Sequence, residues 1–344
     1  MKEKVILRPT ILAIALLGCS HQMTAQQESL RPSFEVEYTG ELQTDFKRSR
    51  LANLLQLRAE VPLSKALSFQ VHSVSIASSD ESPLADDLMG YSNLDAENIP
   101  FALSVAGLMW HINDRHSLFA GIRRMDEDYF SSDAIGLFTT SPCGIFPTIS
   151  YNHDIATYPK ASMGIHYAYD TENLCLQASL YNGLGYNRFT GRDNVFRICP
   201  KSDGVFGLAQ AEYRHHDSHY FLGASTHYCD LMGTADRRMH SSAWFYAEQS
   251  LSSILTLLVA YGHAFNSDHP CRDFCGLGGN YALQRAEFGI FTEYTRIDGI
   301  DEWATELTCK LGISEYLSLQ PVLHILTTDG KTKCIGMMRL NVNL

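Results

Sequence analysis

Outside its N-terminal segment, the sequence contains no apolar run of the length that a transmembrane helix requires. A helix that spans a bilayer needs about 20 consecutive apolar residues. The apolar run at residues 11–17 is much shorter, and the mean hydropathy of the whole chain is only -0.12. The sequence therefore argues against a protein built from membrane-spanning helices.

The chain also has few positive charges and lacks the common cofactor motifs. It carries 27 Lys and Arg residues against 38 Asp and Glu residues, which gives a net charge of -11. Nucleic-acid binding calls for a basic surface, so none is expected. No P-loop, dinucleotide fingerprint or zinc-finger spacing is present, and Ser, His and Asp residues cannot be grouped into a catalytic trio. We therefore expect no enzyme, no cofactor and no metal.

The N-terminal segment predicts export. Basic residues precede the short apolar run at 11–17, as in a secretory signal peptide. Cleavage after Ala25 makes residues 1–25 the signal and residues 26–344 one mature domain. A second interpretation is lipidation at Cys19. Loss of the segment moves the net charge to about -13. The basic residues are Lys2, Lys4 and Arg8.

Apolar and polar residues alternate with period two through the mature chain, and 17 Tyr and 17 Phe residues are present. This pattern predicts about sixteen strands, each close to the length that a tilted strand needs to cross a bilayer. An even number suits an antiparallel transmembrane barrel, and this size encloses water. The expected strands are 33–46, 51–62, 66–78, 102–112, 116–125, 161–170, 173–182, 204–215, 219–229, 241–250, 254–265, 273–282, 285–297, 302–313, 316–327 and 334–344.

The connections between these strands alternate in length. Links after even-numbered strands have two or three residues, whereas several links after odd-numbered strands are long. Short periplasmic turns and long extracellular loops are typical of outer-membrane barrels. The fold class is therefore an all-β transmembrane antiparallel barrel, with the third outer loop, the longest, folded into the lumen. The long links are roughly 79–101, 126–160, 183–203 and 230–240.

Side-chain parity indicates which face of the barrel meets lipid. In the second strand Leu55 and Leu57 face one way and Gln56 the other, and the eighth, fourteenth and last strands alternate similarly. A charge on the lipid face costs about 2–4 kcal/mol at mid-depth, so the polar side chains should face the lumen. The same alternation would suit a secreted soluble β-protein, with its polar face in solvent. The predicted pore-wall residues are Arg58, Glu60, Gln210, Glu212 and Arg214.

Five sequence blocks follow one another along the chain: GIRRMDEDYFSSDAIGLFTTSPCGIFPTIS, ATYPKASMGIHYAY, LCLQASLYNGL, AWFYAEQSL and YLSLQPVLHIL. In this order they resemble the OprB family of carbohydrate-selective porins, and the resemblance spans roughly residue 103 to the C-terminus. Two departures stand out: the acidic run at residues 126–128 replaces a more amide-rich tract, and Leu344 ends the chain in place of an aromatic residue.

The resemblance implies a constriction where the fifth strand meets the third loop. Charged groups held across a narrow passage can exchange hydrogen bonds with sugar hydroxyls, and aromatic faces can stack on a pyranose ring. Such contacts must be weak, because a tight site would block a diffusive channel. The alternative is that the charged cluster only pins the loop to the wall. The predicted contact residues are Arg123, Arg124, Asp126, Glu127, Asp128, Tyr129 and Phe130.

The resemblance further implies passive, carbohydrate-selective diffusion across a bacterial outer membrane. The partners would be small saccharides, outer-membrane lipid and the barrel assembly machinery, and porins of this size often form homotrimers. One alternative is a general or ion-selective porin without sugar preference. Another is a non-conducting surface barrel or secreted β-protein with a binding or hydrolase role.

Cysteine and histidine positions leave further alternatives open. Eight cysteines follow Cys19, and their spacing does not determine any disulfide. The pairs Cys143–Cys199 and Cys271–Cys275 are two options, and free thiols are another. A zinc site combining Cys271 and Cys275 with histidines is disfavoured because no second ligand pair follows. Solvated histidines are expected at a periplasmic turn. The histidines concerned are His263 and His269 for zinc, and His215, His216 and His219 for the turn.

Overall fold

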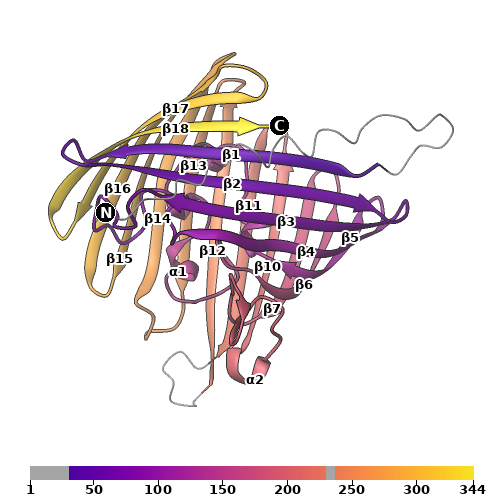
Figure 1. The fold of residues 1–344 in the computed structure, drawn as a ribbon. Coiled ribbons are helices and arrows are strands. Elements are labelled where there is room, and N and C mark those ends of the chain that lie inside the picture. Colours follow the sequence, from indigo (N-terminus) through magenta and orange to yellow (C-terminus); the bar gives the residue numbers. More distant parts are fainter. Residues whose placement is uncertain (1–30, 230–236) are drawn as a thin grey trace, which may run out of the picture.

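The computed structural model describes residues 31–229 and 237–344, and within these residues sixteen antiparallel strands close into a barrel (Figure 1). The barrel closes where β1 (Ser33–Thr44) pairs with β18 (Lys331–Asn343). Two further short strands pair with each other inside one loop. Among the described residues, none of the helices has the length and apolar character to cross a membrane. The expected signal peptide, residues 1–25, and Cys19 lie outside the described residues.

The first half of the barrel contains β1, β2 (Ser49–Pro62), β3 (Leu67–Ser78), β4 (Ile99–Asn113), β5 (His116–Arg123), β6 (Ser162–Asp170), β7 (Leu174–Asn182) and β10 (Val205–His215). The second half contains β11 (Ser218–Cys229), β12 (Arg238–Ser252), β13 (Leu255–Ala264), β14 (Cys271–Ala282), β15 (Ala286–Ile297), β16 (Ile300–Gly312), β17 (Leu317–Thr328) and β18. The loops hold β8 (Phe189–Thr190), β9 (Asp193–Asn194), α1 (Pro147–Ser150), α2 (Pro200–Asp203) and three single turns of 3-10 helix. The predicted number and order of barrel strands are confirmed.

The predicted alternation of short and long connections is also confirmed. At the end of the barrel where β1 begins and β18 ends, called here the terminal end, the turns have two to four residues, as at 114–115 and 63–66. The opposite, loop end carries the second loop (79–98), the third loop (124–161) and the fourth loop (183–204). Some links at the loop end are also tight, because Asp-Gly pairs with two positive φ angles make hairpin turns there. These pairs are Asp298-Gly299 and Asp329-Gly330.

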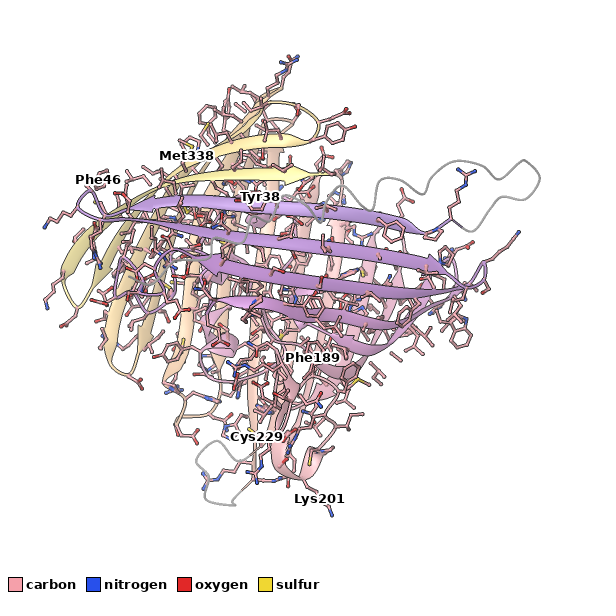
Figure 2. The ribbon with its side chains drawn as sticks, in the orientation of Figure 1. Tyr38, Phe46, Phe189, Lys201, Cys229 and Met338 are labelled. Carbon is pink, nitrogen blue, oxygen red and sulfur yellow. The ribbon has the colours of Figure 1, made fainter. Side chains whose placement is uncertain are left out.

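The two faces of the strands differ as the parity of the sequence predicts. On β16 the side chains of Glu302 and Glu306 are buried, whereas Trp303 and Leu307 are about half exposed on the outer face. The outward side chains on other strands are largely apolar as well, and side chains project all round the barrel (Figure 2). Several inward polar residues bond to loops that enter the barrel, whereas others, such as Arg339 and Glu41, pair across the wall. The outer exposed apolar residues include Phe34, Val36, Leu57, Ile165, Leu222, Leu277 and Ile290.

The hydrophobic core lies inside the barrel, between the third loop and the wall formed by β10 to β18. Loop residues such as Phe138 and Phe146 pack on wall residues such as Phe291 and Phe274, with ring centroids 5.1 and 4.7 Å apart. Burial of a large apolar side chain contributes about 1.5–3 kcal/mol. The interior is therefore partly a packed core rather than an open channel across its whole width.

We predict that Gly223→Ala destabilises the barrel by about 1–3 kcal/mol through overpacking. A Cβ atom at Gly223 would lie 2.2 Å from the ring of Trp244, which is buried on the neighbouring strand. Gly207→Ala is the matched control, because its Cβ would meet its nearest atom at 3.6 Å. Urea unfolding in lipid vesicles measures the difference. Equal stability of the two variants would show that the wall is not tightly packed at Trp244.

Candidate functional site

The third loop leaves β5 and turns back into the barrel as a series of short helical turns. These are η2 (Met125–Glu127), η3 (Ile135–Leu137), η4 (Ser141–Cys143) and α1 (Pro147–Ser150). Pro142 and Pro147 stand at the start of the last two turns, where the missing N–H and fixed φ of proline suit a helix. Each turn leaves backbone N–H groups at its start without a partner inside the turn. The wall supplies partners for two of these turns.

Glutamates on the barrel wall accept these N–H groups. Glu248 on β12 accepts hydrogen bonds from Ala134 N and Ile135 N, at 3.0 and 2.9 Å, where η3 begins. Glu306 on β16 accepts bonds from Thr139 N at 2.8 Å and Thr140 N at 3.2 Å, just before η4. The loop is thus held across the lumen by carboxylates that are far away in sequence.

The second loop also folds into the lumen, which the sequence did not predict. Glu302 on β16 accepts hydrogen bonds from Leu88 N and Met89 N, at 2.7 and 2.8 Å. Tyr91 donates to Gln43 on β1 at 2.9 Å. The only available signal was the unusual length of this loop. The lumen is therefore narrowed from two sides.

The charged residues at the start of the third loop pair with one another. Arg123 makes a bidentate pair with Asp128, at 2.6 and 2.5 Å, and both side chains are largely buried. Arg124 pairs with Glu127 at 2.5 Å and lies 3.7 Å from Asp126. The structure therefore brings five of the predicted contact residues into one buried cluster. This arrangement matches the alternative in which the charged cluster holds the third loop to the barrel wall.

Electrostatics differ between the acids of this cluster. Burial would raise the pKa of Glu127, but Arg124 and His72 hold it well below its ordinary value. Burial raises the pKa of Asp126, and Arg124 offsets the rise only in part. Glu127 is thus the fixed ion-pair partner of Arg124. Asp126 also accepts a hydrogen bond from Tyr158 N at 3.2 Å.

Tyr129 and Phe130 lie in the hydrophobic core. Tyr129 is fully buried, and its hydroxyl lies 2.9 Å from Ser179 Oγ on β7. The Phe130 ring is 4.9 Å from the ring of Trp244 and 5.0 Å from that of Phe146. Both ring faces are covered by protein, so the structure leaves neither ring free to stack on a sugar. Their observed contacts attach the loop to the wall.

The predicted pore-wall residues face the lumen side of their strands but are not among the residues that line the cavity described below. Arg58 is 3.8 Å from Glu37, with both side chains about one-third exposed. Gln210 is buried and accepts a bond from the Trp244 indole at 3.0 Å. The remaining wall residues lie near the turns of the terminal end: Glu60 on β2, and Glu212, which is paired with Arg214 at 2.9 Å.

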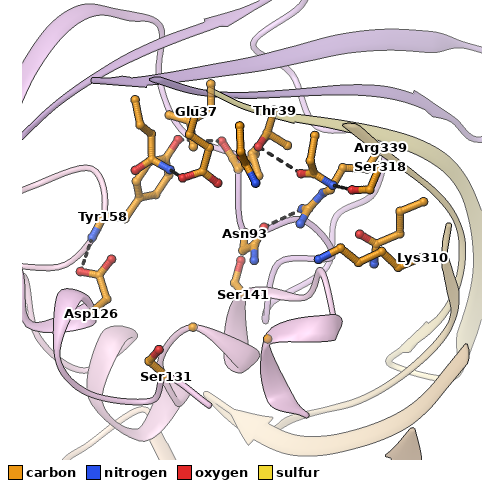
Figure 3. A pocket seen from close by; sticks show the side chains of 18 of the residues that line it. Glu37, Thr39, Asn93, Asp126, Ser131, Ser141, Tyr158, Lys310, Ser318 and Arg339 are labelled. Atoms are coloured by element: carbon orange, nitrogen blue, oxygen red, sulfur yellow. Dashed lines mark hydrogen bonds between the residues drawn. The ribbon is translucent and has the colours of Figure 1, made fainter. Parts of the chain in front are cut away.

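An open cavity of about 690 Å³ lies between the inward loops and the wall formed by β1, β2 and β16 to β18. Figure 3 shows Glu37, Thr39 and Arg339 on one side of the opening and Asp126 and Ser131 on the other. Its lining is rich in hydroxyl, amide and charged groups. Of the predicted contact residues, Arg124, Asp126 and Phe130 reach it. Other lining residues are Gln56, Asn93, Asp95, Ser141, Tyr158, Lys310, Tyr316, Gln320 and Asn341.

Two basic residues of the cavity differ in how firmly they are held. Arg339 on β18 donates to Glu41 at 2.8 Å and to Asn93 of the second loop at 2.6 Å. Lys310 on β16 is exposed and makes no ion pair with any described residue. Among the aromatic rings of the lining, Tyr316 is 52% exposed. Lys310 and Tyr316 therefore present exposed side chains to the cavity.

The cysteine and histidine alternatives are resolved in part. Cys143, Cys199, Cys271 and Cys275 form no disulfide, so neither option for pairing is realised. His263 bonds to Asp273 at 2.7 Å, and His269 instead lies beside His153 and His240, so the zinc grouping with Cys271 and Cys275 is not assembled. His215, His216 and His219 lie around the turn at 216–217, as expected.

Comparison with known proteins supports the fold. No family model and no curated protein matches the chain. Among solved structures, Pseudomonas putida OprB at high pH is similar with a TM-score of 0.75 and 14% identity, covering 91% of this chain and 94% of that one. A loop-deletion mutant of OmpT, an outer membrane protein of Vibrio cholerae, is similar with a TM-score of 0.61 and 11% identity, covering 91% of this chain and 99% of that one. A mutant of the Rh. blastica porin has a TM-score of 0.60 and 12% identity, and the match covers 91% of this chain and 100% of that one.

We predict that Arg123→Ala loosens the start of the third loop, because it leaves the buried Asp128 without its cation. Loss of one partner of a buried ion pair costs about 3–5 kcal/mol. Arg296→Ala is the control, since the Arg296–Asp301 pair is about half exposed and such pairs contribute about 0–1 kcal/mol. Protease cleavage of the third loop and urea unfolding measure both effects. Equal loss in the two variants would contradict a pinning role for Arg123.

We predict that ionisation of Asp87 weakens the packing of the second loop. Burial, together with the nearby Glu302, raises the pKa of Asp87 from 3.8 to about 7. A carboxyl with a raised folded pKa binds more protons when folded, so stability should fall as pH rises from about 4 to about 7. Protease cleavage of the second loop should be faster at pH 8 than at pH 5, and Asp87→Asn should remove this difference. Asp86→Asn, at an exposed neighbour, should retain it.

Proposed function

We propose that this protein is an outer-membrane porin that allows passive diffusion of small solutes. The observation that carries the proposal is a closed sixteen-strand barrel, counted over residues 31–229 and 237–344, with an apolar outer face and a lumen narrowed by two inward loops. Barrels of this size enclose water, and an apolar belt suits contact with lipid. The similarity of the fold to solved outer-membrane porins supports the same function.

Within this function we propose a preference for carbohydrates. The cavity presents hydroxyl, amide and charged groups at many points, so a solute rich in hydroxyls can exchange one weak hydrogen bond for another as it moves. Lys310 and Asp126 would contact hydroxyls, and the exposed Tyr316 ring would lie against the apolar face of a sugar. Weak contacts of this kind slow a solute without trapping it. The OprB neighbour is in keeping with this preference.

Single-channel conductance in a planar bilayer, with glucose and maltooligosaccharides titrated in, tests the proposal. We expect a steady open conductance that falls saturably as sugar is added. Conductance that no sugar reduces would favour a general or ion-selective porin. Absence of conductance would contradict the channel and favour a non-conducting surface barrel or a secreted β-protein.

We predict that Lys310→Gln weakens the sugar block about fivefold. The change removes a charged donor, and a hydrogen bond contributes about 1 kcal/mol net. Lys201→Gln is the control, because Lys201 lies on α2 in the fourth loop, away from the cavity (Figure 2). Equal block in Lys310→Gln and wild type would place the sugar contacts elsewhere.

Localisation and assembly are parts of the same proposal. Extraction of the protein from cells only with detergent, in the outer-membrane fraction, is expected. We also predict a homotrimer. Chemical cross-linking in detergent measures the number of chains in the assembly.

A further inference from the structure

Five metal-ligating side chains from four segments gather at the loop end of the barrel, away from the cavity. His153 comes from the third loop, His227 and Cys229 from β11, His240 from β12, and His269 from the link between β13 and β14. Each of the five is at most 6% exposed. Figure 2 places Cys229 near this end, close to α2 and Lys201. Since histidine is rarely buried without a partner, such a group calls for a physical explanation.

The distances suit a shared ligand. His153 Nδ1 and His227 Nδ1 are 3.1 Å apart. Ligand atoms of these two residues and of Cys229 all lie within 4.8 Å of one another. The His269 ring lies 5.1 Å from the His153 ring and 5.0 Å from the His240 ring. In a tetrahedral zinc site with Zn–N of 2.0–2.1 Å, neighbouring nitrogens lie about 3.3 Å apart.

The hydrogen bonding of the cluster is incomplete without such a ligand. Within the described residues, four of its buried imidazole nitrogens have no hydrogen-bond partner. A buried polar group left unsatisfied costs about 1–3 kcal/mol. The four nitrogens are His227 Nε2, His240 Nδ1, His269 Nδ1 and His269 Nε2.

We propose that His153, His227 and Cys229 bind a divalent transition metal of the zinc type, with His269 as the fourth ligand and His240 beside it. Imidazole and thiolate are the ligands that zinc prefers, and four protein ligands make a closed, structural site. The site differs from the zinc site considered for Cys271, Cys275, His263 and His269, with which it shares only His269. Its ligands come from separate segments, so no short motif could reveal it.

The metal would fasten the third loop to the barrel wall at a further place. His153 belongs to that loop, whereas His227 and Cys229 belong to β11. The carboxylate anchors Glu248 and Glu306 hold the earlier part of the same loop. Binding should therefore stabilise the loop whether or not the barrel conducts a sugar. This inference does not depend on the solute proposed above.

Metal titration of the full mature chain tests the proposal. The protein is purified in detergent with chelator and reductant, freed of both, and titrated with Zn²⁺ and Co²⁺. We expect one tightly bound ion per chain, and for Co²⁺ the charge-transfer band that a thiolate ligand produces. Cys229→Ser should abolish that band, and His153→Gln should weaken binding by more than about tenfold, the loss that even an orienting partner can cause.

Two control variants separate this site from adventitious binding. His263→Gln removes a histidine that is bonded to Asp273, and the double variant His215→Gln with His216→Gln removes the turn histidines. Both should bind the metal as wild type does. Circular dichroism of every variant verifies that the barrel is folded. Absence of tight binding, or binding that folded Cys229→Ser and His153→Gln retain in full, would overturn the proposal.

Discussion

The interior of this barrel depends on one interaction, the acceptance of loop N–H groups by buried glutamates of the wall. A chain segment that enters a barrel leaves the sheet and loses its ladder partners, yet its backbone groups still need hydrogen bonds. Glu248, Glu306 and Glu302 each accept two N–H groups from an inward loop. One carboxylate thus satisfies two donors at once. These bonds hold both loops across the lumen.

These hydrogen bonds also determine which part of the lumen stays open. Carboxylates that accept backbone bonds face the loops, and the apolar residues between them pack into a core with Phe130 and Phe146. This core fills part of the lumen beside β10 to β15. The open cavity lies against β1, β2 and β16 to β18. Most charged side chains at the start of the third loop form ion pairs with one another, such as Arg123–Asp128.

The sequence predicted the barrel well because period-two alternation is a local signal. Strand order, parity and the inward third loop need only neighbouring residues and connection lengths. The alternation around Glu306 shows that it faces inward, but not that it meets Thr139, which is 167 residues away. The inward second loop and the histidine cluster were missed for the same reason. The sequence also located the charged cluster, but it did not show whether these residues pair with one another. Arg123 and Asp128 could equally hold the loop to the wall or contact a solute.

The residues that anchor the third loop are different from the exposed residues that line the cavity. The groups that hold the third loop are buried in its contacts with the wall, whereas Lys310 and Tyr316 reach the cavity without taking part in those contacts. A change at Lys310 alters the charge of the cavity and leaves the hydrogen bonds of Glu306 intact. A change at Glu306 leaves two loop donors unsatisfied and alters the position of the loop itself. The charge of the cavity and the rigidity of the loop are therefore separable properties in this fold, because different residues determine them.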